Sequence, residues 1–222
     1  MTEILLIRHG ETDWNAERRL QGHLDIPLNA HGQRQAAALG HALLDEPLDA
    51  IIASDLQRAR QTAEAIAAPR GMTVLIDPGL RERCFGAFEG LRYDEINSVY
   101  PEAYAAWQAR DLDARYPQGV HAAETMREFF MRAVSAITRL ASDGRHRKIA
   151  IVTHGGVLEC AYRAAQGVDL AQARDFEVKN ASVNRVLWNG AGMQITGWAD
   201  VAHLGAHSDA HSDDTALDEI DR

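Results

Sequence analysis

Two segments far apart along the chain each place a histidine directly after a run of mainly apolar residues. Residues 4–7 lead into Arg8-His9-Gly10, and residues 148–153 lead into His154-Gly155-Gly156. Short runs rich in isoleucine, leucine and valine are typical of buried parallel strands. Open α/β sheets bind ligands beyond the carboxyl ends of such strands, where a glycine lets the backbone turn tightly. We therefore expect the two imidazoles to share one site.

Three arginines supply positive charge of the kind that a phosphate group requires. Arg8 precedes the first histidine, and Arg58 and Arg60 lie in the first turn of a helix expected over residues 56–68. A helix N-terminus attracts anions, and the planar guanidinium matches the geometry of phosphate oxygens. A solvated surface position is the alternative for Arg58 and, more strongly, for Arg60. With the two histidines, the arginines indicate a phosphate cage.

Glu82 is the acid that this site lacks so far. It follows the strand expected at residues 73–76 and stands between Arg81 and Arg83. A carboxyl group that reaches the cage can protonate a leaving oxygen. The alternative for Glu82 is a surface ion pair with one of the flanking arginines.

Strands and helices alternate along most of the chain. Strands are expected at 4–7, 49–54, 73–76 and 148–153, and helices at 33–44, 56–68, 123–140 and 157–165. Asn189-Gly190 separates segments 181–187 and 193–198, which pair best as a hairpin, and residues 13–22 are expected to form a loop. The pattern predicts an α/β fold, a three-layer α/β/α sandwich whose mostly parallel central sheet carries helices on both faces.

One segment interrupts this alternation. Residues 77–122 hold turn clusters, most of the aromatic residues and two short expected helices, so they are predicted to form a small cap or lid. Residues 1–204 are then one α/β domain, followed by an acidic and flexible tail over residues 205–222. His203, His207 and His211 recur every four residues, but glycine and serine in this region argue against a helix that would align them for a metal.

Composition excludes several classes of protein. The chain has 222 residues, with 32 Asp and Glu against 23 Lys and Arg and a net charge of −9, which argues against a nucleic-acid partner. We expect no membrane association, because no run is long and apolar enough to span a bilayer. The 2 cysteines form no disulfide framework, and the start of the chain does not resemble a signal peptide. A cytoplasmic location is expected.

Four motifs, in this order, resemble the histidine phosphatase superfamily, which includes the phosphoglycerate mutases. They cover nearly the whole chain except the tail and comprise residues 6–15 (LIRHGETDWN), 54–63 (SDLQRARQTA), 80–82 (LRE) and 152–156 (VTHGG). The resemblance implies that His9 is a nucleophile that becomes a phosphohistidine and that Glu82 is first a general acid and then a general base. Arg8, Arg58 and His154 would hold the phosphoryl oxygens.

The same resemblance implies further contacts to phosphate or substrate. These residues are expected to line the pocket: Gly10, Glu11, Thr12, Asn15, Gln21, Gly22, Arg60, Arg83, Cys84, Phe85, Gly155 and Gly156. The partner would be a small phosphorylated metabolite, and no metal is expected, since arginine and histidine would neutralise the phosphoryl charge. A homodimer stays open.

Two outcomes of phosphoryl transfer remain to be separated. The segment 85–90, Phe-Gly-Ala-Phe-Glu-Gly, resembles the phosphatase branch, in which water accepts the phosphoryl group. The alternative is a glycolytic mutase that interconverts 2- and 3-phosphoglycerate, for which 2,3-bisphosphoglycerate would be the phosphoryl donor.

Two readings from other classes also stay open. One is a metal-dependent hydrolase with His9, His154 and Glu82 as ligands, although the flanking Arg8 and Arg58 would repel a cation. The other is a phosphate-binding or signalling module without turnover, although binding alone needs no acid such as Glu82.

Overall fold

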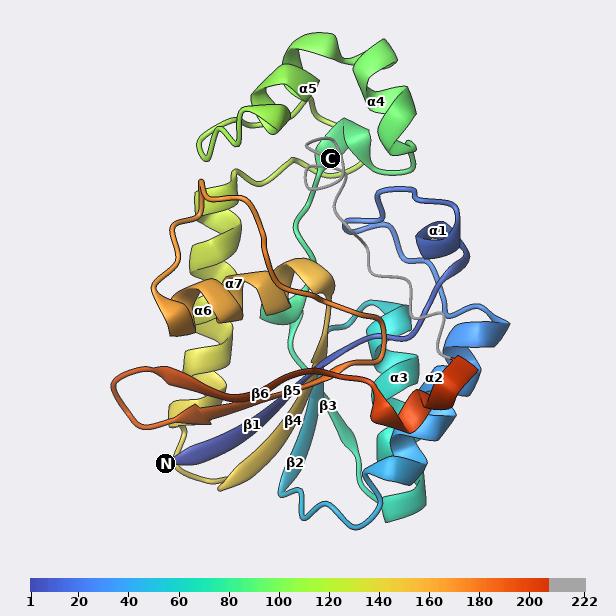
Figure 1. Ribbon diagram of the computed structural model, residues 1–222, viewed down its shortest axis with the longest axis vertical. Coiled ribbons are helices and arrows are strands. Elements are labelled where there is room, and N and C mark those ends of the chain that lie inside the picture. The colour runs from blue at the N-terminus through green and yellow to red at the C-terminus, as the bar shows by residue number, and fades with distance from the viewer. Residues whose placement is uncertain (208–222) are drawn as a thin grey trace.

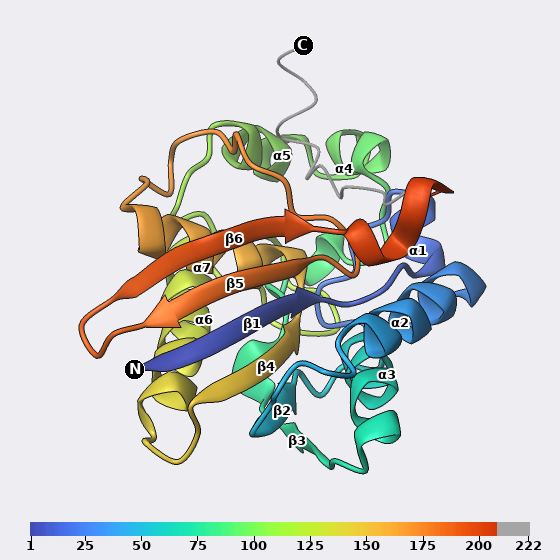
Figure 2. The same cartoon turned by 60° about the horizontal axis from the view of Figure 1, so that its bottom comes forward.

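A six-stranded sheet lies at the centre of the molecule (Figure 1). The computed structural model describes residues 1–207 of the chain. Figure 2 shows the strands in the order β3-β2-β4-β1-β5-β6. Their bounds are β1 Thr2–Arg8, β2 Ala50–Ala53, β3 Val74–Ile76, β4 Lys148–Thr153, β5 Val183–Trp188 and β6 Met193–Asp200. β1 to β4 pair in parallel, whereas β5 runs antiparallel to β1 and forms a hairpin with β6.

Helices cover both faces of this sheet. α2 (Ala30–Ala42) and α3 (Gln57–Ala67) pack on one face, and α6 (Met126–Ser142) and α7 (Gly155–Gln166) on the other (Figure 1). Side chains of β1 alternate between the two layers, since Leu5 and Ile7 join the core under α2 and α3 while Ile4 and Leu6 join the other. Full burial of such a side chain stabilises the fold by about 1.5–3 kcal/mol. The three-layer α/β/α sandwich is confirmed.

The segment 77–122 forms a separate layer over one end of the sheet (Figure 1). It carries α4 (Tyr93–Val99) and α5 (Pro101–Gln108), together with the 3-10 turns η2 (Pro78–Leu80) and η3 (Gly86–Phe88). It has its own apolar cluster, in which Phe88 stacks on Tyr116 with 4.4 Å between ring centroids. This segment, which we call the cap, therefore has an apolar core that Leu20 and Ala123 complete.

Several helices begin or end elsewhere than expected. The loop expected at 13–22 contains the short helix α1 (Asp13–Ala16), capped by Thr12. α2 starts before residue 33 because the side chain of Asn29 caps it, and α6 starts at Met126 because Thr125 caps it. Two 3-10 turns complete the list, η1 (Ala68–Arg70) and η4 (Ala202–His207).

The expectation of an acidic, flexible tail falls largely outside the described residues. The structure describes the chain to residue 207, so the idea of a histidine row that includes His211 has no counterpart in it. Within residues 1–207, no helix combines the length and the apolar character needed to cross a membrane.

Candidate active site

His9 and His154 lie side by side at the carboxyl ends of neighbouring strands. β1 pairs with β4 so that Arg8 faces Thr153, and the backbone N–H of His9 donates to the carbonyl of Thr153 over 2.9 Å. The two imidazole centroids are 5.2 Å apart, and both residues are buried. The shared site expected from the two strand ends is therefore present in the geometry.

Hydrogen bonds orient the two rings differently. Nδ1 of His9 lies 2.7 Å from the carbonyl oxygen of Gly10, which can only accept, so this nitrogen carries the hydrogen. The opposite nitrogen, Nε2, then has a free lone pair. In His154, Nδ1 accepts from Nε of Arg58 over 3.2 Å, so the hydrogen resides on Nε2. That buried Nε2–H meets no hydrogen-bond partner among the described residues.

Both histidines are held neutral. Burial lowers the pKa of His9 well below its usual value, and Arg58 and Arg8 lower it further. Burial also lowers the pKa of His154, with Arg58 as the second cause. A neutral His9 can use its lone pair on phosphorus, and a neutral His154 can donate Nε2–H to a phosphoryl oxygen.

Arg8 and Arg58 are fixed around the rings by carbonyl groups. Nη1 of Arg8 donates to the carbonyl of Val178. The terminal nitrogens of Arg58 donate to the carbonyls of Gly22 and Leu24 at 2.8 and 3.0 Å. Both arginines are 1% exposed. Their guanidinium groups are pre-positioned for an anion, so little ordering is needed when one binds.

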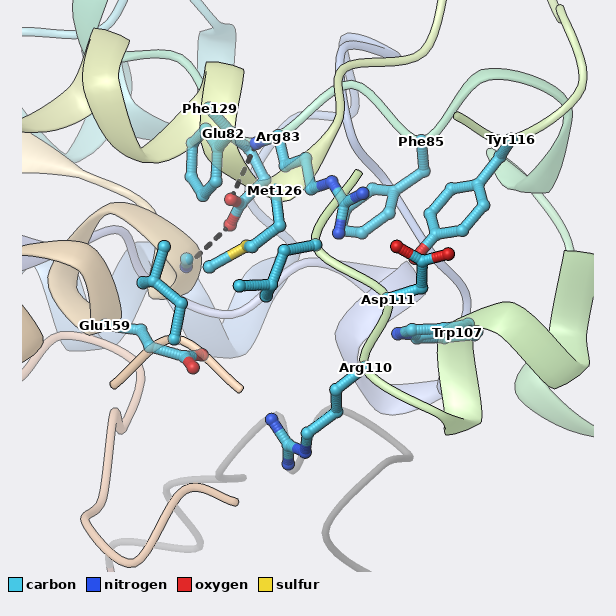
Figure 3. Close-up of a pocket in the computed structure, with 13 residues that line it drawn as sticks. Glu82, Arg83, Phe85, Trp107, Arg110, Asp111, Tyr116, Met126, Phe129 and Glu159 are labelled. Atoms are coloured by element: carbon cyan, nitrogen blue, oxygen red, sulfur yellow. Dashed lines mark hydrogen bonds between the residues drawn. The ribbon is translucent and has the colours of Figure 1, made fainter. Parts of the chain in front are cut away.

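Glu82 reaches the same place from the cap side. Figure 3 shows its carboxylate between two backbone N–H groups, those of Arg83 at 2.8 Å and Gly156 at 3.0 Å. Burial raises the pKa of Glu82, against the lowering effect of these two hydrogen bonds and of Arg58 and Arg8. The approach needs glycine at position 156, because a Cβ there would lie 2.2 Å from the carboxylate. The carboxyl group of Glu82 is thus held beside the N-terminus of α7 (Gly155–Gln166).

Arg132 of α6 holds the backbone that carries Glu82. It donates to the carbonyls of Gly79, Arg81 and Glu82 over 3.1, 2.9 and 3.0 Å. Its other contacts bind it to the carboxylate of Glu124, at 2.7 Å for each of two nitrogens. One side chain therefore ties three backbone carbonyls of residues 79–82 to the helix.

We expect Arg132→Met to lower kcat by roughly 10- to 100-fold, since a misplaced general acid loses much of the 10²–10⁴-fold gain from proton transfer. The loss should be largest for esters with a poor leaving group, because these need the proton of Glu82. The measurement is kcat for phenyl and alkyl phosphates beside the far-UV spectrum. Arg139→Met, which changes an exposed arginine of the same helix that pairs with Asp77, is the control. Equal losses for all leaving groups would deny Arg132 this positioning role.

A cavity opens beside Arg58 and Glu82, and seven of the expected site residues line it, whereas Arg8, His9 and His154 are not among its lining residues. We call it the phosphoryl cavity; of the expected residues it is lined by Gln21, Gly22, Arg58, Glu82, Phe85, Gly155 and Gly156. Gly155 also begins α7, whose N-terminal N–H groups favour an anion at this point. The cavity thus brings the arginine, the acid and the helix end to one place.

Four expected contacts instead build the turn that carries His9. The N–H of Gly10 donates to the hydroxyl of Thr62, and Glu11 accepts from the Asn29 side chain. Thr12 and Asn15 bond to each other across the first turn of α1. None of the four is among the residues that line the phosphoryl cavity. Their geometry supports a stabilising role for this turn.

Arg60 and Cys84 lie away from the site. Arg60 stands two residues from Arg58, which on a helix is more than half a turn, and its half-exposed side chain faces Glu64 at 3.8 Å. Cys84 is buried beside Glu89 and Glu124, and burial raises the pKa of its thiol to about 12. Neither residue lines the phosphoryl cavity or the cavity that adjoins it, whereas Arg83 lines the adjoining one together with Glu82 and Phe85.

The structure adds residues that the sequence did not point to. Asn180 is fully buried and donates to the carbonyl of His9 over 3.0 Å, and Thr62 accepts from Gly10. Arg19 and Arg174 line the phosphoryl cavity. Asn180, Arg19 and Arg174 occur in stretches without a periodic or glycine-rich pattern, so no local signal marks them, whereas Thr62 lies within the motif at residues 54–63.

The groups around the two histidines do not favour the binding of a metal ion. Among residues 1–207, no group of three or more His, Cys, Asp or Glu side chains is arranged to hold a metal ion. Nδ1 of each histidine is already engaged, by Gly10 and by Arg58. The two buried guanidinium groups would repel a cation at the same place that they favour a phosphate.

Comparison with known proteins extends this geometry to a family. A profile of the histidine phosphatase superfamily (branch 1) matches residues 4–201. Phosphoglycerate mutase-like protein 4 of Arabidopsis thaliana is 40% identical over 206 residues, which are 91% of this chain and 86% of that protein. The metal-independent phosphoserine phosphatase of the same plant is 36% identical over 209 residues, 93% and 84% of the two chains.

A solved structure has the same fold as this chain. YhfR of Bacillus stearothermophilus superposes with a TM-score of 0.82 at 33% identity and covers 92% of this chain and 100% of its own. The match of the family profile over nearly the whole described chain, with relatives well above 30% identity, confirms the resemblance seen in the four motifs. The chain belongs to the histidine phosphatase superfamily, branch 1.

Proposed function

We propose that this protein is a metal-independent phosphomonoesterase that acts on small phosphorylated metabolites through phosphorylated His9. The observation that carries the proposal is the state of the two rings. His9 offers a lone pair at Nε2, His154 offers a hydrogen at its own Nε2, and both are neutral beside two buried arginines. This arrangement suits attack on phosphorus with stabilisation of the equatorial oxygens.

In the first step, the Nε2 lone pair of His9 forms a bond to phosphorus while the bond from phosphorus to the ester oxygen breaks. Glu82, whose pKa is raised by burial, gives its proton to the departing oxygen. Arg8, Arg58 and the Nε2–H of His154 compensate the charge on the three remaining oxygens. The organic part then leaves as a neutral alcohol.

In the second step, the ionised Glu82 removes a proton from a water molecule. The water oxygen bonds to phosphorus and the P–N bond breaks, which returns the lone pair to His9. Inorganic phosphate leaves, and Glu82 is protonated again. Each group therefore ends the cycle in its starting state.

A mutase is the second candidate, because several relatives carry that name, among them phosphoglycerate mutase-like protein 4 and the probable phosphoglycerate mutase GpmB of Klebsiella pneumoniae. A mutase would pass the phosphoryl group from His9 back to a second hydroxyl of the substrate, with 2,3-bisphosphoglycerate as donor. The Phe-Gly-Ala-Phe-Glu-Gly segment at 85–90 favours water as acceptor. A relative that is named a metal-independent phosphoserine phosphatase supports both the hydrolytic outcome and the independence of metals.

Incubation with 3-phosphoglycerate separates the two outcomes. We expect release of inorganic phosphate, with and without 2,3-bisphosphoglycerate, and no accumulation of 2-phosphoglycerate. Phosphate is read with molybdate and the glycerates by ³¹P NMR, and p-nitrophenyl phosphate serves as the general phosphatase substrate. Conversion to 2-phosphoglycerate that depends on the bisphosphate would make the protein a mutase.

Treatment with EDTA tests the metal-independent part of the proposal. We expect the rate with p-nitrophenyl phosphate to stay within about twofold, since fixed guanidinium groups take the place of a cation. The same assay with added Mg²⁺ or Zn²⁺ is the control. Loss of activity that one of these ions restores would replace the arginine-based account by the metal-dependent alternative.

We also propose a cytoplasmic location. Two buried free thiols suit the reducing cytoplasm.

A further inference from the structure

A second cavity lies under the cap and joins the phosphoryl cavity at Glu82. We call it the side cavity; Glu82, Phe85 and Gly156 line both. Its remaining wall comes from α5 and the loop after it, from the start of α6 and from the α7–β5 connection (Figure 3). Three parts of the chain that are remote in sequence thus enclose one space next to the proton donor.

The position of Glu82 indicates which part of the substrate enters the side cavity. If Glu82 protonates the ester oxygen, as the proposed function requires, the carbon bonded to that oxygen must lie within a few ångströms of its carboxylate. The side cavity begins at that carboxylate. The organic part of the substrate therefore extends into the side cavity, while the phosphoryl group faces Arg58.

The wall of the side cavity is mainly apolar and aromatic. Seven side chains of this kind line it: Phe85, Trp107, Leu112, Tyr116, Met126, Phe129 and Leu170. Figure 3 shows the thioether of Met126 and the ring of Phe129 close to the Glu82 carboxylate. Burial of a bulky apolar group against such a wall makes binding more favourable. A short, charged carbon chain buries little apolar surface and gains no such binding free energy.

Charged groups in this cavity are mostly engaged with protein partners. The Glu159 carboxylate accepts from Arg163 at 2.8–2.9 Å, and Arg163 is itself fully buried. The Arg83 guanidinium lies over the rings of Phe85 and Tyr116, at 5.5 and 4.8 Å from their centroids. Arg83 is 6% exposed, and its Nη2 finds no acceptor among the described residues. This nitrogen of Arg83 therefore remains for an oxygen of the ligand, and Arg110 and Asp111 are two further charged residues that line the cavity.

We propose that the preferred substrates are phosphomonoesters whose organic part is bulky and apolar, an aromatic ring or an alkyl chain of several carbons. An acceptor oxygen on that part would meet Nη2 of Arg83. This rests on the proposed phosphatase function and specifies its substrate class. The competing outcome is a preference for small acidic esters, with the acid group held by Arg19 and Arg174 of the phosphoryl cavity.

Alkyl phosphates with leaving groups of similar basicity provide the test. We expect kcat/KM for 2-phenylethyl phosphate to exceed that for ethyl phosphate by roughly 10- to 100-fold, the discrimination that a few buried carbons supply in an apolar pocket. O-phosphoserine should be no better than ethyl phosphate. Equal values for the two alkyl esters, or a clear preference for O-phosphoserine or 3-phosphoglycerate, would overturn the proposal.

Variants of the wall locate the effect. Leu112→Asn and Leu170→Asn change half-buried loop residues, and each should lower kcat/KM for 2-phenylethyl phosphate by about 3- to 10-fold while that for ethyl phosphate stays within about twofold. Leu44→Asn, at a leucine that is 43% exposed, is the matched control and should change neither value. A selectivity that survives both wall variants would place the organic group elsewhere.

p-Nitrophenyl phosphate distinguishes failure of the substrate class from failure of the phosphatase function. If the protein hydrolyses this ester but does not discriminate among the alkyl esters, only the proposed substrate class is contradicted. If no phosphate ester is hydrolysed by a folded protein, the phosphatase function itself fails.

Discussion

Replacing His9 with alanine is expected to lower kcat/KM at least about 10⁴-fold, the scale of loss when a covalent nucleophile is removed. The substitution deletes the only atom placed to form a bond to phosphorus in the proposed cycle, Nε2. Arg8, Arg58 and His154 would still bind phosphate, so KM should change far less than kcat. The measurement is the hydrolysis of p-nitrophenyl phosphate over several orders of magnitude in enzyme concentration.

A control variant and a melting temperature show whether misfolding explains the loss of activity in His9→Ala. His41→Ala changes an exposed histidine near the end of α2 and should keep full activity. The melting temperature of His9→Ala should stay near that of the parent chain, because the backbone of residue 9 keeps its bonds to Thr153 and Asn180. Activity above about 1% in the folded variant would mean that another group attacks phosphorus.

Glu82→Gln is expected to act selectively on poor leaving groups. An alkyl oxygen needs a proton as the bond to phosphorus breaks, so kcat/KM for 2-phenylethyl phosphate should fall by roughly 10²- to 10⁴-fold. A p-nitrophenolate leaves without help, so kcat/KM for that ester should fall by less than about tenfold. The conservative control is Glu102→Gln, an exposed residue of α5. Equal losses for both esters would remove Glu82 from the acid role.

The pH profile of kcat/KM follows from the same two groups. The lowered pKa of His9 keeps the ring neutral in acid. The acidic limb of the profile that is due to His9 should therefore lie at a pH well below the usual pKa of a histidine. The raised pKa of Glu82 keeps the carboxyl protonated to higher pH, and the rate with alkyl esters should fall as pH rises through that pKa. In Glu82→Gln the alkaline limb should vanish. A limb that persists in this variant would belong to a different acid.

Hydrophobic periodicity was sufficient to predict the sandwich. Four apolar runs became the parallel strands β1 to β4, and Asn189-Gly190 marked the β5–β6 hairpin. Helix ends were less accurate, because a cap residue several positions upstream sets the start. Asn29 begins α2 earlier than the alanine-rich pattern suggested, and Thr125 delays α6 to Met126.

From the sequence, only those site residues could be predicted that lie at strand ends or within the four motifs. His9, His154 and Arg58 meet because a parallel register brings distant segments to one edge of the sheet. Arg60 faces Glu64 and does not line the phosphoryl cavity, because on the helix it lies more than half a turn from Arg58. Arg132 could not be found, since its role rests on backbone carbonyls whose positions the sequence does not encode locally.

Acid-labile labelling tests the central claim most directly, namely that His9 carries the phosphoryl group between the two steps. The enzyme is mixed with ³²P-labelled substrate and quenched in alkali, and the phosphorylated peptide is identified by mass spectrometry. We predict a label that survives alkali, is lost in acid and maps to His9, and that is absent from His9→Ala. A label on another residue in the parent enzyme, or full turnover in His9→Ala, would contradict the account.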